Sequence, residues 1–326
     1  MIIARAPLRL SLGGGGTDLP EFYKKNGSGL WFSIAIDKYI YISFNQKLGN
    51  SSFLRYSQIE ELSDLRKSKN RILSAIFNRY ETNSPVEFTS HADIPSGTGL
   101  GSSGTFTVAS LAAIKASKNL SISKYELAEE ACDIEINDLQ SPSGKQDQYI
   151  AAYGGLRKFK VDKAGNVLSS SIGFKNSLYD FFYNHIVLIY TDISRSANDI
   201  LEKMKVDNNL YKASQREIAI HEYVDALLSE NHIELGKILD AYWSKKRVSS
   251  ANMSSSRIDE LYSFAKNHGG IGGKVVGAGG GGFIMMICES ARDLIKSCSK
   301  NGIKTILCKP DIEGVKIIEN DFHNFF

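Results

Sequence analysis

The sequence contains few cysteines and little net charge. Among its 326 residues only Cys132, Cys288, Cys298 and Cys308 are cysteines, and no two of them have C-x-x-C spacing. Cysteines this sparse exclude a disulfide framework, and zinc clusters usually have ligands two to four residues apart. We therefore expect four reduced thiols in the core. The 39 Lys and Arg residues nearly balance 36 Asp and Glu residues, and the resulting net charge of +3 argues against a nucleic-acid partner.

Long apolar runs are also absent. The most apolar part of the N-terminal half, Trp31 to Phe44, is interrupted by Asp37 and Lys38, whereas a membrane helix needs about 20 apolar residues. The opening MIIARAPLRL lacks the charged start, apolar run and small-residue cleavage site of a signal peptide. We therefore expect a cytoplasmic protein without a membrane partner, and the sequence leaves the oligomeric state open.

The chain does contain alternating strand and helix patterns separated by glycine-rich breaks. Runs of β-branched and aromatic residues dominate the first 60 residues, and the composition becomes helical from Ser196 to Lys266. From Gly273 to Phe326 the pattern alternates again. These patterns predict an α+β protein with two domains, residues 1–180 and 181–326, and antiparallel strand pairing in the second.

The strongest functional signal is a glycine-rich loop, PSGTGLGSSG, between a predicted strand at Val86–His91 and a predicted small-residue helix at Thr105–Lys118. Glycines let backbone N–H groups approach an anion closely, and the unpaired N–H groups at a helix start attract phosphate. We predict that this loop binds the phosphates of a nucleotide. The predicted nucleotide-binding residues are Pro95, Gly97, Gly99, Leu100, Gly101, Ser102, Ser103 and Gly104.

Other nucleotide-binding motifs fit the sequence less well. Both Gly99–Gly104 and Gly277–Gly282 match G-x-G-x-x-G. A dinucleotide fold also needs an acidic residue at a strand end about 20 residues further on, where this chain begins another helix. Walker A and protein-kinase signatures are absent. An NAD-dependent oxidoreductase is nevertheless an alternative of a different class.

Two further segments carry candidate chemistry. In APLRLSLGGGGTDLP, Arg9 and Asp18 flank four consecutive glycines, which suits either close approach of the backbone to a ligand or a hairpin turn. Thr17 and Asp18 offer hydrogen bonds to hydroxyl groups. Asp147 lies in the segment Gly144–Gln148, which begins a turn after the predicted helix that carries Glu135. Taken alone, Asp147 could equally be an acidic residue without a catalytic role, because the helix dipole favours acidic residues at the start of a helix.

Together these segments resemble the three motifs of the GHMP kinases, the superfamily of galactokinase, homoserine kinase, mevalonate kinase and phosphomevalonate kinase. Motif one is Ala6–Asp18, motif two is Pro95–Thr105 and motif three is Lys274–Phe283, in the family's order and with its spacing. The resemblance runs nearly end to end. It implies a two-domain fold with a glycine-rich phosphate loop and a C-terminal α+β domain, with ATP between the two domains.

The resemblance also implies roles for individual residues. Ser103 and Glu135 match the family's Mg²⁺ ligands, and Asp147 falls where the sugar-kinase branch has its general base. Arg9 matches an arginine that lies near both that base and the transferring phosphate, so Asp147 and Arg9 are the implied catalytic residues. The implied substrate-binding residues are Gly14, Gly15, Gly16, Thr17, Asp18, Gly279 and Gly280.

Within the superfamily, LRLSLGGGGTDLP and GKQDQYIAAYGG are most similar to the branch that acts on D-glycero-D-manno-heptose 7-phosphate. This resemblance implies an enzyme that uses ATP and Mg²⁺ to phosphorylate the anomeric hydroxyl of that sugar phosphate. The product would be the 1,7-bisphosphate, a precursor for nucleotide-heptose and surface polysaccharide biosynthesis. Galactose is not the expected acceptor, because Gly13–Gly16 replaces the galactose-contacting glutamate and histidine of galactokinases.

The sequence leaves two alternatives to this function open. Within the family, the alternative is a free-sugar kinase similar to fucokinase or galactokinase. The alternative of a different class is a relative that binds sugar but catalyses no reaction. No motif identifies the cations that would bind the acceptor's own phosphate, although Lys24, Lys38 and Arg195 are candidates by position.

Overall fold

The computed structural model describes residues 1–82, 84–120, 123–194, 213–248 and 253–320. Arg195 and the first part of the helical region expected from Ser196 onward lie outside the described residues. In the described part of the chain, no helix is long and apolar enough to cross a membrane. All four cysteines are free and buried, which confirms the expectation from the sequence.

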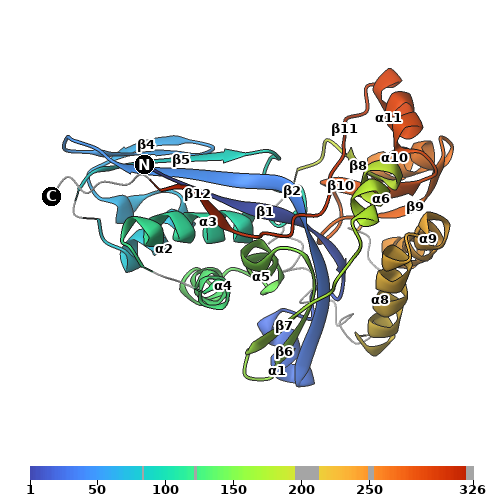
Figure 1. The fold of residues 1–326 in the computed structure, drawn as a ribbon, viewed down its shortest axis with the longest axis horizontal. Helices are drawn as coiled ribbons and strands as arrows, with labels where there is room; N and C mark the ends of the chain where they lie inside the picture. The colour runs from blue at the N-terminus through green and yellow to red at the C-terminus, as the bar shows by residue number, and fades with distance from the viewer. Residues whose placement is uncertain (83, 121–122, 195–212, 249–252, 321–326) are drawn as a thin grey trace.

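The strands form two sheets, which lie at opposite ends of the view in Figure 1. The first sheet has the order β12-β1-β2-β5-β3-β4, and β6 joins it through β2 and pairs in turn with β7. Its strands are β1 (Ile2–Gly13), β2 (Ser28–Gln46), β3 (Ser52–Arg55), β4 (Ile59–Leu62), β5 (Val86–Ala92), β6 (Leu156–Asp162), β7 (Val167–Ser171) and β12 (Lys316–Asn320). The second sheet has the order β11-β8-β10-β9. Its strands are β8 (Ile186–Tyr190), β9 (Gly270–Val275), β10 (Phe283–Cys288) and β11 (Thr305–Ile306).

The helices of the N-terminal half lie mainly along the first sheet, with α2, α3, α4 and α5 on one of its faces (Figure 1). They are α1 (Pro20–Asn26), the 3-10 turn η1 (Leu65–Lys67), α2 (Arg71–Arg79), α3 (Ser102–Ser117), α4 (Lys124–Asp133), the π-helical turn η2 (Ile134–Asp138) and α5 (Gln146–Tyr153). The second sheet is accompanied by α6 (Ser177–His185), α8 (Ala213–Leu228), α9 (His232–Val248), α10 (Ser256–Lys266) and α11 (Ala291–Lys300).

Helix α3 is the central helix of the first sheet. Twelve of its 16 residues are buried, because the helix contacts β1, β2, α4 and α5 on different sides. A helix surrounded in this way must be apolar or small-sided nearly all round, and the sequence after the phosphate loop has this composition. These contacts hold α3 beside β1.

Strand β2 runs unbroken for 19 residues, although its apolar pattern is interrupted by Asp37 and Lys38. These two residues have no partner in the pairing of β2 with β1, which steps from Pro7 opposite Tyr39 to Leu8 opposite Ile36. An irregularity of this kind lets a strand take up extra residues and bend without ending. The two polar residues therefore mark a bulge rather than a turn.

The chain passes from the first sheet to the second between β7 and β8, and it returns at its C-terminal end. Strand β12 pairs antiparallel with β1, opposite Ile2 to Arg5. The division at residue 180 therefore stays a proposal, and within residues 181–326 strand β12 belongs to the first sheet. All pairings in the second sheet are antiparallel, as the sequence predicts.

Candidate active site

The predicted phosphate loop, Pro95–Gly104 (hereafter the phosphate loop), connects β5 to α3 through glycines in a left-handed backbone conformation. Gly97, Gly99 and Gly101 have φ values of 75°, 82° and 82°, a region that glycine reaches without strain. Gly101 precedes α3, and no side chain caps the start of that helix. The first N–H groups of a helix have no acceptor within it, so this geometry suits a phosphate group.

The motif-three loop of the second sheet packs directly on the phosphate loop. A Cβ atom added at Gly99 would lie 2.5 Å from the carbonyl oxygen of Val276, and one added at Gly282 would lie 2.1 Å from that of Thr98. These positions therefore leave room only for hydrogen. The glycines of motifs two and three allow the two backbones to meet across the junction of the two sheets.

We expect Gly282→Ala to weaken both folding and ATP binding, and Gly302→Ala to weaken folding only. Both glycines have positive φ, 80° and 68°, so alanine costs about 1–2 kcal/mol of conformational strain at either position. A Cβ at Gly302 meets nothing within 4 Å, whereas one at Gly282 overlaps the Thr98 carbonyl. Overpacking adds roughly 1–3 kcal/mol. Urea unfolding and the KM for ATP measure the two effects, and equal behaviour of the variants would contradict the role of this contact.

Arg9 of β1 joins the phosphate loop to the start of α5. Its Nε donates to Asp147 Oδ1 at 2.8 Å, its Nη2 lies 2.7 Å from the same oxygen, and its Nη1 donates to the Gly99 carbonyl at 2.5 Å. The Arg9 side chain is 7% exposed and that of Asp147 is 27% exposed. The structure thus brings these two predicted catalytic residues together at the loop and leaves the carboxylate accessible.

Glu135 lies in the π-helical turn η2 and is only 3% exposed. Ser103 Oγ donates to its Oε2 at 2.7 Å, while Thr107 Oγ1 and Gln148 Nε2 donate to its Oε1 at 3.0 and 2.9 Å. Burial raises the pKa of Glu135 although these three hydrogen bonds act in the opposite direction. Thr107 and Gln148 are not among the residues predicted from the sequence, because their residue types and spacing carry no distinctive signal.

The Ser103 and Glu135 pair fits a Mg²⁺ ion. Mg²⁺ is commonly bound through one or two protein oxygens and takes its other ligands from water and substrate phosphates. Among the described residues, no group of three or more His, Cys, Asp or Glu side chains could hold a metal ion by itself. The Ser103 hydroxyl in the first turn of α3 and the buried Glu135 carboxylate of η2 would therefore need the nucleotide phosphates to complete a Mg²⁺ site.

Thr17 is buried and bonded to the backbone. Its hydroxyl accepts from the Leu30 N–H at 3.0 Å, and the hydroxyl hydrogen can reach the carbonyl oxygen of Leu30 at 2.7 Å or that of Gly14 at 2.8 Å. Gly14 has a φ of 79°, and a Cβ there would lie 2.1 Å from the Leu30 carbonyl oxygen. These contacts shape the turn after β1, and direct contact of Thr17 with a sugar stays a prediction.

Asp18 links motif one to the segment before α5. Its Oδ1 accepts from the Gly16 N–H at 2.9 Å and its Oδ2 from the Gln146 N–H at 3.0 Å. Gly144 is close enough that a Cβ there would lie 1.9 Å from Asp18 Oδ2. Burial raises the pKa of Asp18, and the charge of Asp147 adds to this shift. Asp18 therefore holds motif one beside Asp147, while its contact with a sugar hydroxyl stays a prediction.

The remaining predicted substrate-binding glycines lie in two different loops. Gly15 leaves its neighbourhood open, since a Cβ there would meet only Ser11 Oγ, at 3.6 Å. Gly280 donates its N–H to the Met253 carbonyl at 3.0 Å, and a Cβ at Gly279 would lie 2.9 Å from the Met253 sulfur. Substrate contact at these glycines also stays a prediction.

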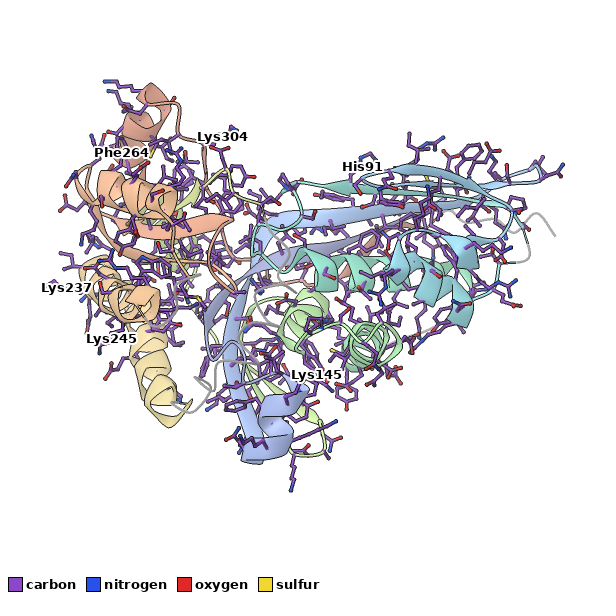
Figure 2. All side chains as sticks on the ribbon, turned by 180° about the vertical axis from the view of Figure 1, so that it is seen from behind. His91, Lys145, Lys237, Lys245, Phe264 and Lys304 are labelled. Carbon is purple, nitrogen blue, oxygen red and sulfur yellow. The ribbon has the colours of Figure 1, made fainter. Side chains whose placement is uncertain are left out.

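A partly buried ion pair that the sequence did not indicate holds the start of α5. Lys145, labelled in Figure 2, donates to both carboxylate oxygens of Glu129 at 2.8 and 2.9 Å and to the Gly165 carbonyl at 2.7 Å. Tyr149 also donates to Glu129. Lys145 and Tyr149 precede and follow Asp147 by two residues, so these contacts with α4 hold the chain on both sides of Asp147.

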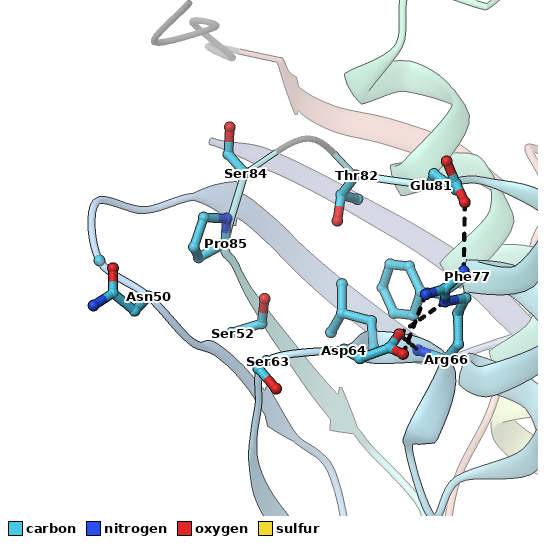
Figure 3. Close-up of a pocket in the computed structure, with 12 residues that line it drawn as sticks. Asn50, Ser52, Ser63, Asp64, Arg66, Phe77, Glu81, Thr82, Ser84 and Pro85 are labelled. Carbon is cyan, nitrogen blue, oxygen red and sulfur yellow. Dashed lines mark hydrogen bonds and ion pairs between the residues drawn. The ribbon is translucent and has the colours of Figure 1, made fainter.

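A separate hollow of about 550 Å³ lies between the β3–β4 hairpin, η1 and the segments before and after α2 (Figure 3). Arg66 pairs there with Asp64 at 2.9 Å and with Glu81 at 3.5 Å. The lining residues are Gly49, Asn50, Ser52, Ser63, Asp64, Leu65, Arg66, Phe77, Glu81, Thr82, Ser84 and Pro85. The predicted site residues do not line it, and its charged groups are paired with one another.

Comparison with known proteins gives matches over most of the chain. Residues 68–155 match the GHMP kinases N terminal domain, and residues 223–304 match the GHMP kinases C terminal family. The chain is 31% identical to D-glycero-alpha-D-manno-heptose 7-phosphate kinase of Campylobacter jejuni over 319 residues, which cover 92% of this chain and 93% of that protein. It is 26% identical to mevalonate kinase of Saccharolobus solfataricus over 328 residues, covering 96% and 98% of the two chains.

Two solved structures have a similar fold over almost the whole chain. A D-glycero-D-manno-heptose 1-phosphate kinase from Bacteriodes thetaiotaomicron has a TM-score of 0.78 at 23% identity and covers 98% of this chain and 99% of its own. A putative sugar kinase from Campylobacter jejuni has a TM-score of 0.75 at 26% identity and 97% coverage of both chains. The predicted two-domain α+β fold is confirmed. The G-x-G-x-x-G matches therefore belong to motifs two and three rather than to a dinucleotide-binding fold, and the chain belongs to the GHMP kinase family.

Proposed function

We propose that this kinase transfers the γ-phosphoryl group of ATP to the anomeric hydroxyl of D-glycero-D-manno-heptose 7-phosphate. The product would be the 1,7-bisphosphate, which serves nucleotide-heptose and surface polysaccharide biosynthesis. The observation that carries the chemistry is the Arg9–Asp147 pair, at 2.7 Å, beside the phosphate loop. The choice of acceptor is supported by the 31% identity to the Campylobacter heptose 7-phosphate kinase over nearly the full length of both chains.

The phosphate loop would bind the triphosphate through backbone N–H groups and the start of α3, where the helix dipole favours negative charge. Ser103 and Glu135 would hold Mg²⁺, which neutralises charge on the β and γ phosphates when it is bound. Phosphoryl transfer asks mainly for positioning and charge neutralisation. Arg9, held by Asp147 and the Gly99 carbonyl, would offset the negative charge that develops on the transferred group.

Asp147 would orient the acceptor hydroxyl and take up its proton. The hydroxyl oxygen forms a bond to the γ-phosphorus as the bond from that phosphorus to the oxygen of the leaving ADP breaks. A carboxylate is a weak base for an alcohol, so its proton transfer is expected late in the reaction, when the hydroxyl has become acidic. An anomeric hydroxyl is more acidic than other sugar hydroxyls, which favours it as the acceptor group.

The proposal predicts that wild-type protein with ATP and Mg²⁺ releases ADP in the presence of D-glycero-D-manno-heptose 7-phosphate. The comparison panel contains the heptose 1-phosphate, mannose, fucose, galactose and mevalonate. Phosphorus NMR should show the new phosphate on the anomeric carbon of the product. Turnover with fucose or galactose alone would support a free-sugar kinase, and turnover with mevalonate or the 1-phosphate alone would replace the proposed acceptor.

A further inference from the structure

Lys274 of motif three is a buried lysine to which the mechanism above gives no role. It lies in β9 and is 6% exposed. Its Nζ donates to the carbonyl oxygens of Ser11 at 2.8 Å and Leu12 at 3.0 Å, residues near the end of β1. One side chain of the second sheet thereby binds the backbone of the first sheet directly before the Gly13–Gly16 run.

The end of β1 needs such a donor because one of its edges lacks a strand there. On that edge β12 pairs only with Ile2 to Arg5. Further along the same edge, the Arg9 N–H donates a hydrogen bond to the carbonyl oxygen of Leu100 in the phosphate loop. Beyond this point, no strand in the described part of the chain runs along the edge. Buried carbonyl groups need hydrogen-bond partners, and an ammonium group is a stronger donor than a neutral one.

The surroundings of Lys274 are aromatic and cationic. The ring of Tyr223 in α8 and that of Tyr242 in α9 lie 5.4 and 5.5 Å from its Nζ, which is within the range of cation–π attraction. Burial, together with the nearby charges of Lys246 in α9 and Arg9 in β1, lowers the pKa of Lys274 to about 7. No ion pair between Lys274 and a carboxylate occurs among the described residues. Its favourable contacts among the described residues are therefore mainly the hydrogen bonds to the two carbonyl groups and the cation–π contacts with the two rings.

We propose that Lys274 is a positioning residue that holds the end of β1 and the Gly13–Gly16 run in the conformation that binds the acceptor. The inference rests on the proposed function and on the substrate-binding role that the family resemblance implies for Gly14, Gly15 and Gly16. Arg9 and Ser11 are two residues apart on one strand, so a shift of the end of β1 would move the acceptor relative to Asp147. Misplacement by about 1 Å can cost an enzyme about 10²-fold in rate.

The test compares Lys274→Met, which keeps an apolar stem without the charge, with Lys274→Arg, which keeps the charge at every relevant pH. At pH 6.5 we expect Lys274→Met to raise the KM for the acceptor by about tenfold or more and to leave the KM for ATP within about twofold. Lys274→Arg should restore most of the loss. Thermal melting of each variant, with and without ATP, checks that the protein is folded and binds nucleotide.

The pH dependence is a second readout. The protonated amine is the better donor and the better partner for the rings, so the hold on β1 weakens as pH rises through about 7. The acceptor KM of the wild type should therefore rise between pH 6 and pH 8 relative to that of Lys274→Arg. The acceptor's own phosphate titrates in the same pH range. This titration affects the wild type and Lys274→Arg equally, so it cancels in the ratio of their acceptor KM values.

Three outcomes would overturn the inference. One is an unchanged acceptor KM in folded Lys274→Met. Another is an equal rise in the KM values for ATP and acceptor, which would mean a general loss of structure. The third is a loss confined to the phosphorylated heptose and absent with the free sugar, which would make Lys274 a direct phosphate ligand. If the wild type uses another acceptor of the panel instead, the proposed acceptor fails, and the same comparison with that acceptor still decides the role of Lys274.

Discussion

Asp147→Asn is expected to lower kcat by roughly 10²- to 10⁴-fold, the usual contribution of a positioned acid or base. The amide keeps the size of the side chain but cannot take up the proton of the acceptor hydroxyl. It also removes the charge that holds the Arg9 guanidinium at 2.7 Å, so part of the loss would come from a less ordered arginine. The phosphate loop keeps its own backbone contacts, and the KM for ATP should change little.

Steady-state ADP release with Asp147→Asn and the wild type measures this effect. Asp293→Asn is the matched control, because Asp293 is exposed in α11, outside the predicted site. Its kcat should equal that of the wild type. A kcat for Asp147→Asn within about fivefold of the wild type, far below the usual effect of a general base, would remove Asp147 from the mechanism and leave orientation of the acceptor to other groups.

Glu135→Gln is expected to lower kcat by roughly 10²- to 10³-fold at ordinary Mg²⁺ concentrations, comparable to the loss of one strong electrostatic interaction in a transition state. The carboxylate accepts hydrogen bonds from Ser103, Thr107 and Gln148. A glutamine offers one acceptor oxygen in place of two, so at least one of these donors turns away. The neutral amide is also a much poorer ligand for Mg²⁺, which prefers charged oxygen.

The Mg²⁺ dependence of kcat at fixed ATP is the decisive measurement for Glu135. High Mg²⁺ should recover part of the activity of Glu135→Gln, because weaker binding can be offset by concentration. Glu319→Gln is the matched control, since Glu319 is exposed on β12, away from the predicted site. An unchanged Mg²⁺ requirement in folded Glu135→Gln would show that the ion is held elsewhere.

The glycine-rich loop and the helix α3 that follows it could be predicted from the sequence because their signals are local. The φ values at Gly97, Gly99 and Gly101 require glycine whatever lies around the loop. The many small and apolar residues after the loop predict a helix that is buried on several sides, and α3 is such a helix. Resemblance to family motifs then supplied the candidate roles of Arg9 and Asp147, which lie 138 positions apart.

Other parts of the fold could not be predicted because their causes are not local. Asp37 and Lys38 interrupt the apolar pattern of β2, but pairing with β1 carries the strand through them as a bulge. Strand β12 joins the first sheet although it follows the whole second sheet in sequence. In both cases the ladder of hydrogen bonds to β1 decides the conformation, and pairing of this kind outweighs local preference.

The sequence by itself determined the family, the glycine-rich loop before α3 and the choice of candidate catalytic residues, because glycine conformations and motif spacing are properties of short segments. Only the tertiary structure decided how these segments are held together. Lys274 reaches carbonyl groups in β1, which lies 263 positions away at Ser11, and Lys145 pairs with Glu129 across two helices. Such contacts depend on which buried polar groups lack a partner after the chain has packed, and no short segment contains that information.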